Sequence, residues 1–127
     1  VATQVIKTMI KNDIKVNGAQ ILMLGITFKE NCPDVRNTKV VDVIRALESY
    51  STEVTVYDPW ANPEEVKHEY GLTCLSALSA GAKYDAIMLA VAHHEFQVLD
   101  LETLKKDNAV VYDVKGILPI EIVNEVL

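Results

Sequence analysis

The chain has 127 residues, half of them apolar and 24% charged, and its formal net charge is −6 at pH 7. This length suits one globular domain with a hydrophobic core, and no apolar run approaches the roughly 20 residues of a membrane span. The acidic balance argues against binding to a nucleic-acid backbone, which requires a basic surface, but permits one small anionic ligand held by a few local cations.

The first predicted element is a helix over residues 3–15. Its apolar residues recur at helical spacing: Val5, Ile6, Met9, Ile10 and Ile14. Gly18 marks the end of this helix. No capping pattern opens it, so the sequence favours a helix that starts before Val1, in a longer protein.

An apolar strand at 19–26 leads into a long polar loop at 27–36. In parallel α/β sheets, ligands bind at the loops that follow the carboxyl ends of strands. This loop carries Lys29 and Arg36, and the next helix, with Asn37 as its predicted N-cap, begins directly after it. Two cations beside a helix N-terminus indicate a shared anionic ligand, although solvated loop charges are the simpler interpretation of both.

Two features of dinucleotide sites are weak in this chain. The turn after the first strand lacks the G-x-G-x-x-G pattern and offers only Gly25, so we expect side chains, and not backbone amides, to hold an anion. Asp58 stands at the end of the second predicted strand, where an acidic ribose ligand would be found. The preferred interpretation of Asp58 is a turn residue before Pro59.

Strands and helices alternate over the rest of the chain. Further strands are predicted at residues 53–57, 72–74, 85–91 and 109–113. Helices are predicted after Asn37, after Asn62-Pro63, after Asp100 and after Pro119. Five alternations indicate a parallel sheet with right-handed crossovers. The strands at 19–26 and 85–91 are the most apolar and belong in the centre, which predicts a three-layer α/β/α, Rossmann-like domain with strand order 3-2-1-4-5.

The other polar candidates are less specific. Lys115 follows the last strand and is either part of the site or an ordinary exposed lysine. His93-His94-Glu95 invites a metal site, but adjacent side chains diverge and no further ligand cluster is visible. Cys32 has no histidine nearby in sequence to act as its base. We therefore predict no metal site and no catalytic residue, and two cysteines without a disulfide framework favour a reducing, cytoplasmic compartment.

Five motifs follow one another along the chain. They are Gly25-Ile26-Thr27-Phe28-Lys29, Pro33-Asp34-Val35-Arg36-Asn37-Thr38, Val56-Tyr57-Asp58-Pro59, Ala92-His93-His94-Glu95-Phe96 and Tyr112-Asp113-Val114-Lys115-Gly116. In order and spacing they resemble the C-terminal, UDP-binding domain of the UDP-glucose/GDP-mannose dehydrogenase family. The resemblance implies that residues 1–18 end a linking helix from a central domain, and that residues 19–127 form the nucleotide-sugar-binding domain.

The resemblance also implies an activity. Such enzymes use NAD to oxidise the C6 alcohol of a UDP-sugar to a uronate, and the version Glu30-Asn31-Cys32-Pro33-Asp34 is most similar to members that act on UDP-N-acetylhexosamines for surface polysaccharides, with UDP-glucose as the other option. Phe28 and Lys29 match positions that contact the UDP-sugar, and Arg36 matches an arginine that reaches NAD. Lys115 stands where many relatives have an arginine for the nucleotide, so a point charge replaces a bidentate fork.

The remaining expectations concern the whole enzyme. In the family, NAD is held mainly by the N-terminal domain and the nucleophilic cysteine lies in the middle of the chain, so these 127 residues alone are expected to be inactive. The resemblance implies a cytoplasmic homo-oligomer whose partners are its UDP-sugar and the rest of its own chain, without nucleic acid or membrane.

Two other classes of protein are alternatives to a domain of a UDP-sugar dehydrogenase. A response-regulator receiver also has five parallel strands, a strand-end aspartate and a lysine after the fifth strand, which Asp58 and Lys115 mimic. A receiver needs an acidic pair after its first strand to hold magnesium, and Gly25-Ile26-Thr27-Phe28 provides none. The other alternative is a stand-alone, non-catalytic nucleotide-binding or regulatory module.

Overall fold

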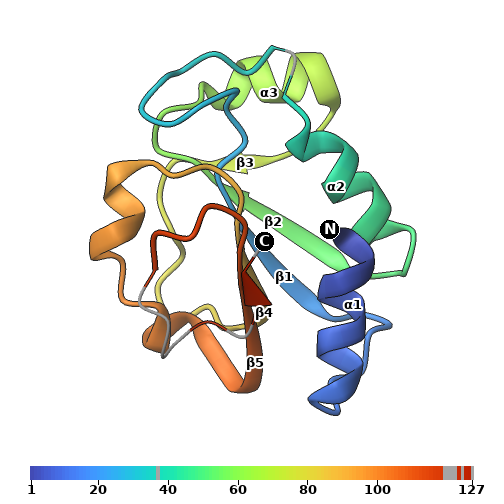
Figure 1. Cartoon of the computed structure of the whole chain (residues 1–127). Helices are drawn as coiled ribbons and strands as arrows, with labels where there is room; N and C mark the ends of the chain where they lie inside the picture. The colour runs from blue at the N-terminus through green and yellow to red at the C-terminus, as the bar shows by residue number, and fades with distance from the viewer. Residues whose placement is uncertain (37, 119–122, 124, 127) are drawn as a thin grey trace.

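The computed structural model describes residues 1–36, 38–118, 123 and 125–126, and within them the strands form one six-stranded parallel sheet (Figure 1). The strands are β1 (Gln20–Leu24), β2 (Glu53–Tyr57), β3 (Cys74–Leu75), β4 (Tyr84–Leu89), β5 (Lys105–Asp113) and β6 (Glu125–Val126). Their order across the sheet is β3-β2-β1-β4-β5-β6. The predicted order 3-2-1-4-5 is confirmed, and β6 adds a further strand beside β5.

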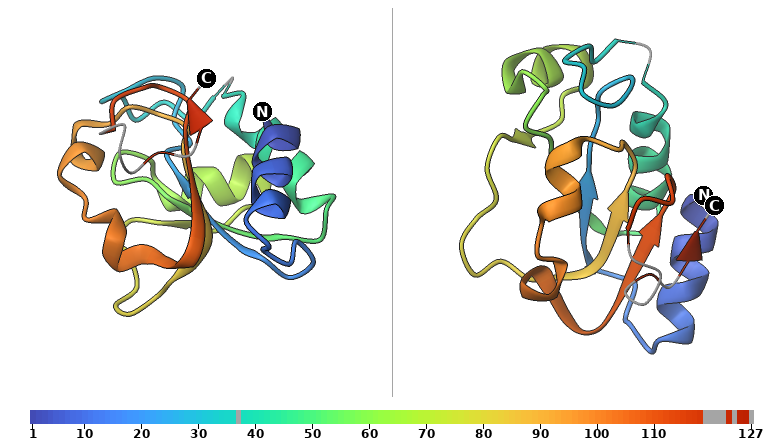
Figure 2. Two further views of the ribbon diagram at one scale, coloured as in Figure 1. Left: turned by 60° about the horizontal axis from the view of Figure 1, so that its bottom comes forward. Right: turned by 60° about the vertical axis from the view of Figure 1, so that its left-hand side comes forward.

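The sheet separates two hydrophobic clusters. Three α-helices contribute to the larger one: α1 (Ala2–Lys11), α2 (Val40–Glu48) and α3 (Pro63–Tyr70). The smaller cluster lies under two short 3-10 helices, η1 (His94–Val98) and η2 (Leu101–Leu104). Figure 2 shows α1 and α2 on one side of the sheet and η1 and η2 on the other. The three layers are therefore as expected, with 3-10 turns over the second face.

Strands β1 and β4 occupy the centre, as their apolar sequences predict. In β1 the four residues from Ile21 to Leu24 are fully buried, because layers cover both faces of the sheet. Ile21 and Met23 belong to one cluster and Leu22 and Leu24 to the other, which is the alternation expected of a strand. This arrangement brings the loops after β1 and β4 together at one end of the sheet.

Helix α3 begins at the Asn62-Pro63 pair that the sequence predicts. Asn62 is its N-cap, and the side-chain oxygen accepts hydrogen bonds from the amides of Glu64 (2.8 Å) and Glu65 (3.4 Å). Pro63 occupies the first helical position, and Gly71 ends the helix with a φ of +69°.

For two other helices the structure does not show the predicted first residue. Helix α2 begins at Val40 with Lys39 at its N-cap position, because the Thr38 hydroxyl accepts the hydrogen bond from the Val40 amide (3.2 Å). The predicted cap, Asn37, lies outside the described residues. Pro119, the predicted start of a last helix, also lies outside them, while Glu125–Val126 form β6. Among the helices that the structure describes, none is long and apolar enough to cross a membrane.

Candidate functional site

A cavity of about 330 Å³ lies where β1, β4 and β5 end. Phe28 and Lys29 reach it from the loop after β1, and Lys115 reaches it from the loop after β5. The structure thus brings together the three residues that sequence analysis selected for one ligand. Lys39, at the start of α2, lines the same cavity. Phe28 is 58% exposed, so its ring is available for contact with a bound molecule.

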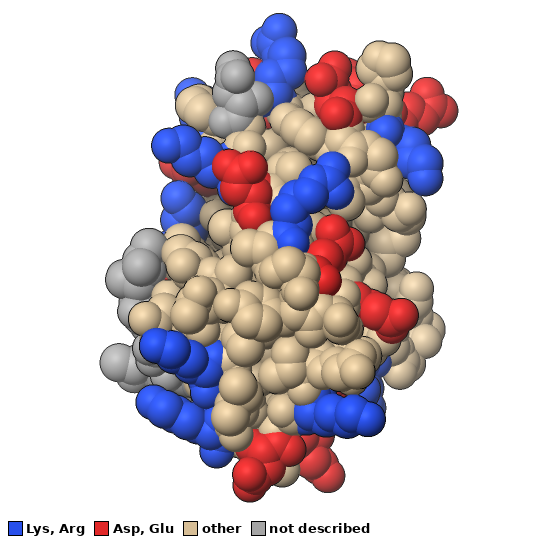
Figure 3. Space-filling view, turned by 90° about the vertical axis from the view of Figure 1, so that its right-hand side faces the viewer, with Lys and Arg blue, Asp and Glu red and all other residues tan. Residues whose placement is uncertain are grey.

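The cavity is locally basic although the whole chain is acidic. Lys29, Lys39 and Lys115 are exposed, and within the described part of the chain none of them pairs with a carboxylate, while Glu30 is the one acid among the described lining residues. The N-terminus of α2 adds a partial positive charge. By contrast, both signs of charge are interspersed on the face of α1 and α2 shown in Figure 3. The cavity is therefore suited to an anion.

Gly25 allows the chain to turn sharply after β1. Its φ is +98°, and a Cβ atom at this position would lie 2.6 Å from Cβ of Val91. The amides of Ala90 and Val91 donate to the carbonyl oxygen of Leu24 (3.0 and 3.3 Å), which holds the ends of β1 and β4 together. Close packing of these two loops, and not a phosphate-binding turn, accounts for the glycine.

Asp58 directly follows β2 and is fully buried. Its carboxylate accepts hydrogen bonds at 2.7–3.2 Å from the amides of Ile26, Thr27, Trp60 and Ala61 and from Nε2 of His93. Burial alone would raise the pKa of Asp58, but these hydrogen bonds outweigh it and hold the pKa below its ordinary value. Both carboxylate oxygens are occupied by protein donors, so Asp58 is a turn residue and not a ribose ligand.

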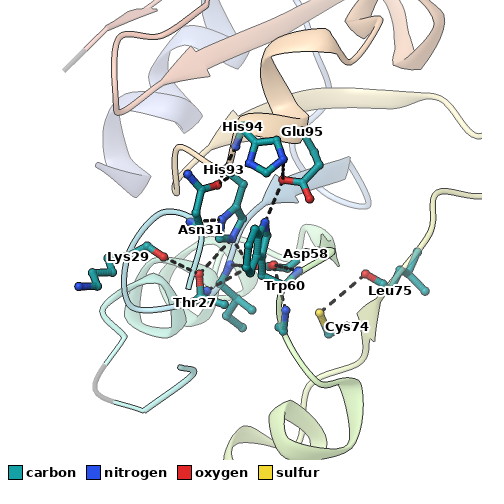
Figure 4. A network of polar contacts seen from close by, with 12 residues as sticks. Thr27, Lys29, Asn31, Asp58, Trp60, Cys74, Leu75, His93, His94 and Glu95 are labelled. Carbon is teal, nitrogen blue, oxygen red and sulfur yellow. Dashed lines mark hydrogen bonds and ion pairs between the residues drawn. The ribbon is translucent and has the colours of Figure 1, made fainter. Parts of the chain in front are cut away.

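The imidazole of His93 lies buried between the loops after β1 and β4 (Figure 4). Its Nδ1 accepts a hydrogen bond from the Asn31 amide (2.9 Å), so in the neutral ring the hydrogen is on Nε2. Nε2 lies 3.0 Å from Oδ2 of Asp58 and 3.0 Å from Oγ1 of Thr27. The Asn31 side chain in turn accepts from the His94 amide (3.0 Å). The polar loop is thus fastened to the loop after β4.

The side chains of His94 and Glu95 approach each other, with Nε2 and Oε1 3.6 Å apart, and the His94 ring meets the Trp60 ring edge-on. Glu95 accepts a hydrogen bond from Nε1 of Trp60 (2.9 Å), and the Trp60 ring stacks on the His93 ring with 6.0 Å between centroids. Within the residues described, no group of three His, Cys, Asp or Glu side chains could hold a metal ion. These three residues instead connect loops at the carboxyl end of the sheet.

Asp113, the last residue of β5, sets the loop that carries Lys115. It is fully buried, and its carboxylate accepts hydrogen bonds from the amides of Lys115 (3.0 Å), Gly116 (2.8 Å) and Leu118 (2.9 Å). The backbone of this loop is therefore fixed while the Lys115 side chain remains exposed. Sequence analysis did not assign this role to Asp113.

Arg36 lies apart from this cavity. It lines a second hollow of about 660 Å³ with Cys32 and with Glu65 and Glu69 of α3, whereas Lys29 lines the first. The structure therefore places Lys29 and Arg36 in separate hollows and does not bring them together. The Arg36 side chain is 77% exposed and pairs with Asp34, with Nε and Oδ1 3.1 Å apart. That hydrogen bond lowers the pKa of Asp34 and raises the pKa of Arg36.

The two cysteines differ in their surroundings. Cys74 is buried in β3, and burial, reinforced by the charge of Asp58, raises the pKa of its thiol to about 11. It is therefore a protonated core residue at neutral pH and not a nucleophile. Cys32 is half-buried beside Arg36 in the second hollow. Both are free thiols.

Lys39 is a lining residue of the cavity that its place in the sequence did not predict. The sequence placed the helix start two positions earlier, which made Lys39 an ordinary residue of the first turn. In the structure Lys39 occupies the N-cap position and faces the cavity. The sequence did offer one indication that Lys39 lies near the site: it stands between the loop motif and the buried Val41 of α2.

Comparison with known sequences gives a consistent result. Residues 22–120 match the sequence model of the "UDP-glucose/GDP-mannose dehydrogenase family, UDP binding domain". A UDP-N-acetyl-D-glucosamine 6-dehydrogenase from Pseudomonas aeruginosa is 50% identical over 93% of this chain and 28% of its own length. A protein of the same name from Salmonella typhi is 47% identical over 95% of this chain and 29% of its own. The chain therefore spans less than a third of these curated relatives.

Solved structures agree on the fold. A dehydrogenase of NDP-N-acetyl-D-galactosaminuronic acid from Methanosarcina mazei superposes with a TM-score of 0.75 at 19% identity, over 95% of this chain and 26% of the other. A UDP-D-ManNAc dehydrogenase from Pyrococcus horikoshii gives a TM-score of 0.73 at 21% identity, over 98% of this chain and 28% of the other. At these identities the comparison establishes the architecture alone.

Proposed function

Since the chain belongs to the UDP-glucose/GDP-mannose dehydrogenase family, as its UDP-binding domain, we propose that it binds the nucleotide part of a UDP-sugar within a larger NAD-dependent 6-dehydrogenase. Residues 19–127 are proposed to form this domain, and α1 (Ala2–Lys11), within residues 1–18, is proposed to be the end of the helix that links it to the central domain. The substrate is a UDP-N-acetylhexosamine, in keeping with the names of the two relatives above. The enzyme oxidises the C6 alcohol to a uronate for surface polysaccharide synthesis.

The observation that most supports this proposal is the shared cavity. Phe28 and Lys29 come from one loop and Lys115, 86 positions after Lys29, comes from another, yet all three line one basic cavity. Lys29 and Lys115 are proposed to donate charge-assisted hydrogen bonds to the diphosphate, and Phe28 to pack against the ligand. Lys39 adds a third positive charge to the lining of the same cavity.

The chain does not itself form a complete NAD site. The turn after β1 continues from Gly25 into Ile26, Thr27 and Phe28 and lacks the glycines that let a backbone approach a pyrophosphate. Asp58 is occupied by protein donors. NAD, the hydride acceptor, is therefore proposed to be held mainly by the N-terminal domain, with exposed Arg36 reaching it across the interdomain cleft. The whole enzyme is proposed to be a cytoplasmic homo-oligomer.

Alanine substitution of Lys29 in the full-length enzyme tests the proposal. Loss of one charge-assisted hydrogen bond should lower kcat/KM for the UDP-sugar roughly ten- to a hundredfold, mainly through KM. Lys115→Ala should act in the same direction, and Arg36→Ala should act mainly through the KM for NAD. Lys15→Ala is a matched control, because Lys15 is exposed but lies outside this cavity. Unchanged kinetics in Lys29→Ala and Lys115→Ala would refute the assignment.

A further inference from the structure

One imidazole fastens both ends of the segment that lines the cavity. The segment is Phe28 to Glu30, and its side chains are exposed, so its position depends on the backbone at either end. Thr27 precedes it and its Oγ1 lies 3.0 Å from Nε2 of His93. Asn31 follows it and its amide donates to Nδ1 of the same ring (2.9 Å). His93 is fully buried, so water does not compete for these contacts.

The direction of each hydrogen bond follows from the donors available. Because the Asn31 amide donates to Nδ1, the ring hydrogen is on Nε2 and is shared between Oδ2 of Asp58 and Oγ1 of Thr27, each at 3.0 Å. The Thr27 hydroxyl donates its own hydrogen to the carbonyl oxygen of Lys29 (3.1 Å). A continuous path of hydrogen bonds therefore runs from the buried carboxylate of Asp58 to the backbone of Lys29 (Figure 4).

We propose, on the premise of the function proposed above, that Thr27 and His93 are positioning residues that hold Lys29 in its nucleotide-binding place. Neither touches the reacting atoms. His93 orients the Thr27 hydroxyl, and that hydroxyl fixes the peptide plane of Lys29. Correct placement of a charged donor matters because a hydrogen bond weakens steeply once its angle or length departs from the favourable range.

The Thr27 hydroxyl has a role that is separable from the stability of the fold. Asp58 holds the backbone amides of Ile26 and Thr27 directly (2.7 and 3.2 Å), so the turn after β1 does not depend on the hydroxyl. The hydrogen of the hydroxyl goes to Lys29. Its removal should therefore displace Lys29 while the turn keeps its main anchors.

A double-mutant cycle in the full-length enzyme tests the proposal. Thr27→Val removes the hydroxyl at nearly constant volume and should raise the KM for the UDP-sugar about three- to tenfold, with the KM for NAD unchanged. Thr27→Ser should restore most of the loss. Adding Thr27→Val to Lys29→Ala should cause no further rise in KM, because Thr27 acts through the side chain that is already missing.

Two further sets of variants test whether the change in KM arises from the positioning of Lys29 or from a general loss of stability. Thr52→Val is the matched control: Thr52 is buried, its hydroxyl also donates to a backbone carbonyl (Leu47, 2.8 Å), and it lies at the amino end of β2. It should lower the melting temperature without changing the KM for the UDP-sugar. His93→Gln keeps a donor near Nε2 but loses the acceptor for Asn31, and should raise this KM less than His93→Phe, which loses both.

The outcomes separate this inference from the proposed function. If Lys29→Ala raises the KM and Thr27→Val multiplies that rise in the double mutant, the two residues act independently and the positioning role is overturned while the nucleotide site stands. If Lys29→Ala leaves the KM unchanged, the nucleotide site and the positioning role both fail. If His93→Phe does not fold, the Thr27 series still decides between these results.

Discussion

Two buried aspartates at strand ends set the loops of the site by accepting hydrogen bonds from backbone amides. Asp58 accepts from the amides of Trp60 and Ala61 just beyond β2, and Asp113 accepts from those of Lys115 and Gly116 just beyond β5. A short carboxylate reaches backbone donors two and three residues ahead, which fixes a turn locally. In Asp58 the second oxygen also accepts from the loop after β1, so one carboxylate coordinates two loops.

Replacing Asp58 with asparagine should lower the free energy of unfolding by about 3 kcal/mol or more at neutral pH. An amide presents its nitrogen to backbone donors that now face a carboxylate oxygen, and a buried donor without an acceptor is costly. Urea unfolding of both proteins by circular dichroism measures the difference. The control is Asp107→Asn, since Asp107 is exposed.

The pH dependence of stability should also differ between the wild type and the Asp58→Asn variant, and the pKa of Asp58 gives the direction of the difference. The folded pKa of Asp58 lies below its ordinary value of 3.8, so the unfolded state binds the proton more readily. The stabilisation is therefore complete above the unfolded pKa and is lost as the pH falls through the folded pKa. The Asp58→Asn variant should lose less stability than the wild type as the pH falls below this ordinary value of 3.8. An equal loss in both proteins would show that Asp58 does not carry this dependence.

Helices and strands differ in how far local sequence could predict them. Both ends of α3 were predictable because Asn62, Pro63 and Gly71 act within a few residues. The start of α2 was not, because the Thr38 hydroxyl takes the first helical amide and moves the start to Val40. Strand β5 begins at Lys105, four residues before its apolar part, and a register irregularity against β4 accommodates this polar extension.

The candidate site was predictable only where its residues lie in motifs. Phe28, Lys29 and Lys115 follow strand ends, and parallel topology brings such ends to one edge. The hydrogen bond between the Asn31 amide and His93 joins residues 62 positions apart, so no local pattern could reveal it. The sequence did not show that Arg36 and Lys29 line different hollows, because the hollow of Arg36 is completed by α3, about 30 residues further along the chain.

The cap of α3 offers a test confined to one helix. Asn62→Ala removes the acceptor for the amides of Glu64 and Glu65 and should destabilise the protein by about 1 kcal/mol, while Asn62→Ser should keep most of the stability. Urea unfolding measures both variants against the wild type. Equal destabilisation by alanine and serine would argue that packing at this position matters and that the cap does not.

At the scale of the whole molecule, the hydrophobic core is buried by packed helices and strands, whereas the candidate ligand site is a cavity lined by loops. The sheet is covered on both faces and both hydrophobic clusters are closed by the chain's own helices. The basic cavity, by contrast, is formed at the end of the sheet by loops, with Lys29, Lys39 and Lys115 exposed. Folding therefore depends on the buried core, and ligand binding depends on the exposed loops. A tight nucleotide site buries most of its ligand.

This difference predicts how the 127 residues behave alone. They should fold cooperatively but bind UDP only at about millimolar affinity, equivalent to roughly 4 kcal/mol, because two or three cations on one side of a cleft supply part of the contacts. Titration by NMR should shift the amides of Phe28, Lys29 and Lys115, and the variant Lys29→Ala with Lys115→Ala should abolish these shifts. Arg36→Ala, which alters the other hollow, is the control and should leave them intact.

The same reasoning predicts that the isolated chain produces no NADH from UDP-sugars and NAD. Hydride transfer requires a bound nicotinamide, and this chain lacks the glycine turn that would hold one. Oxidation to the acid further requires a thiolate to trap the aldehyde, and burial keeps the pKa of Cys74 at about 11. NADH formation by the purified chain would refute this division of labour, and micromolar UDP binding would show that the lysine-lined cavity contributes most of the nucleotide site by itself.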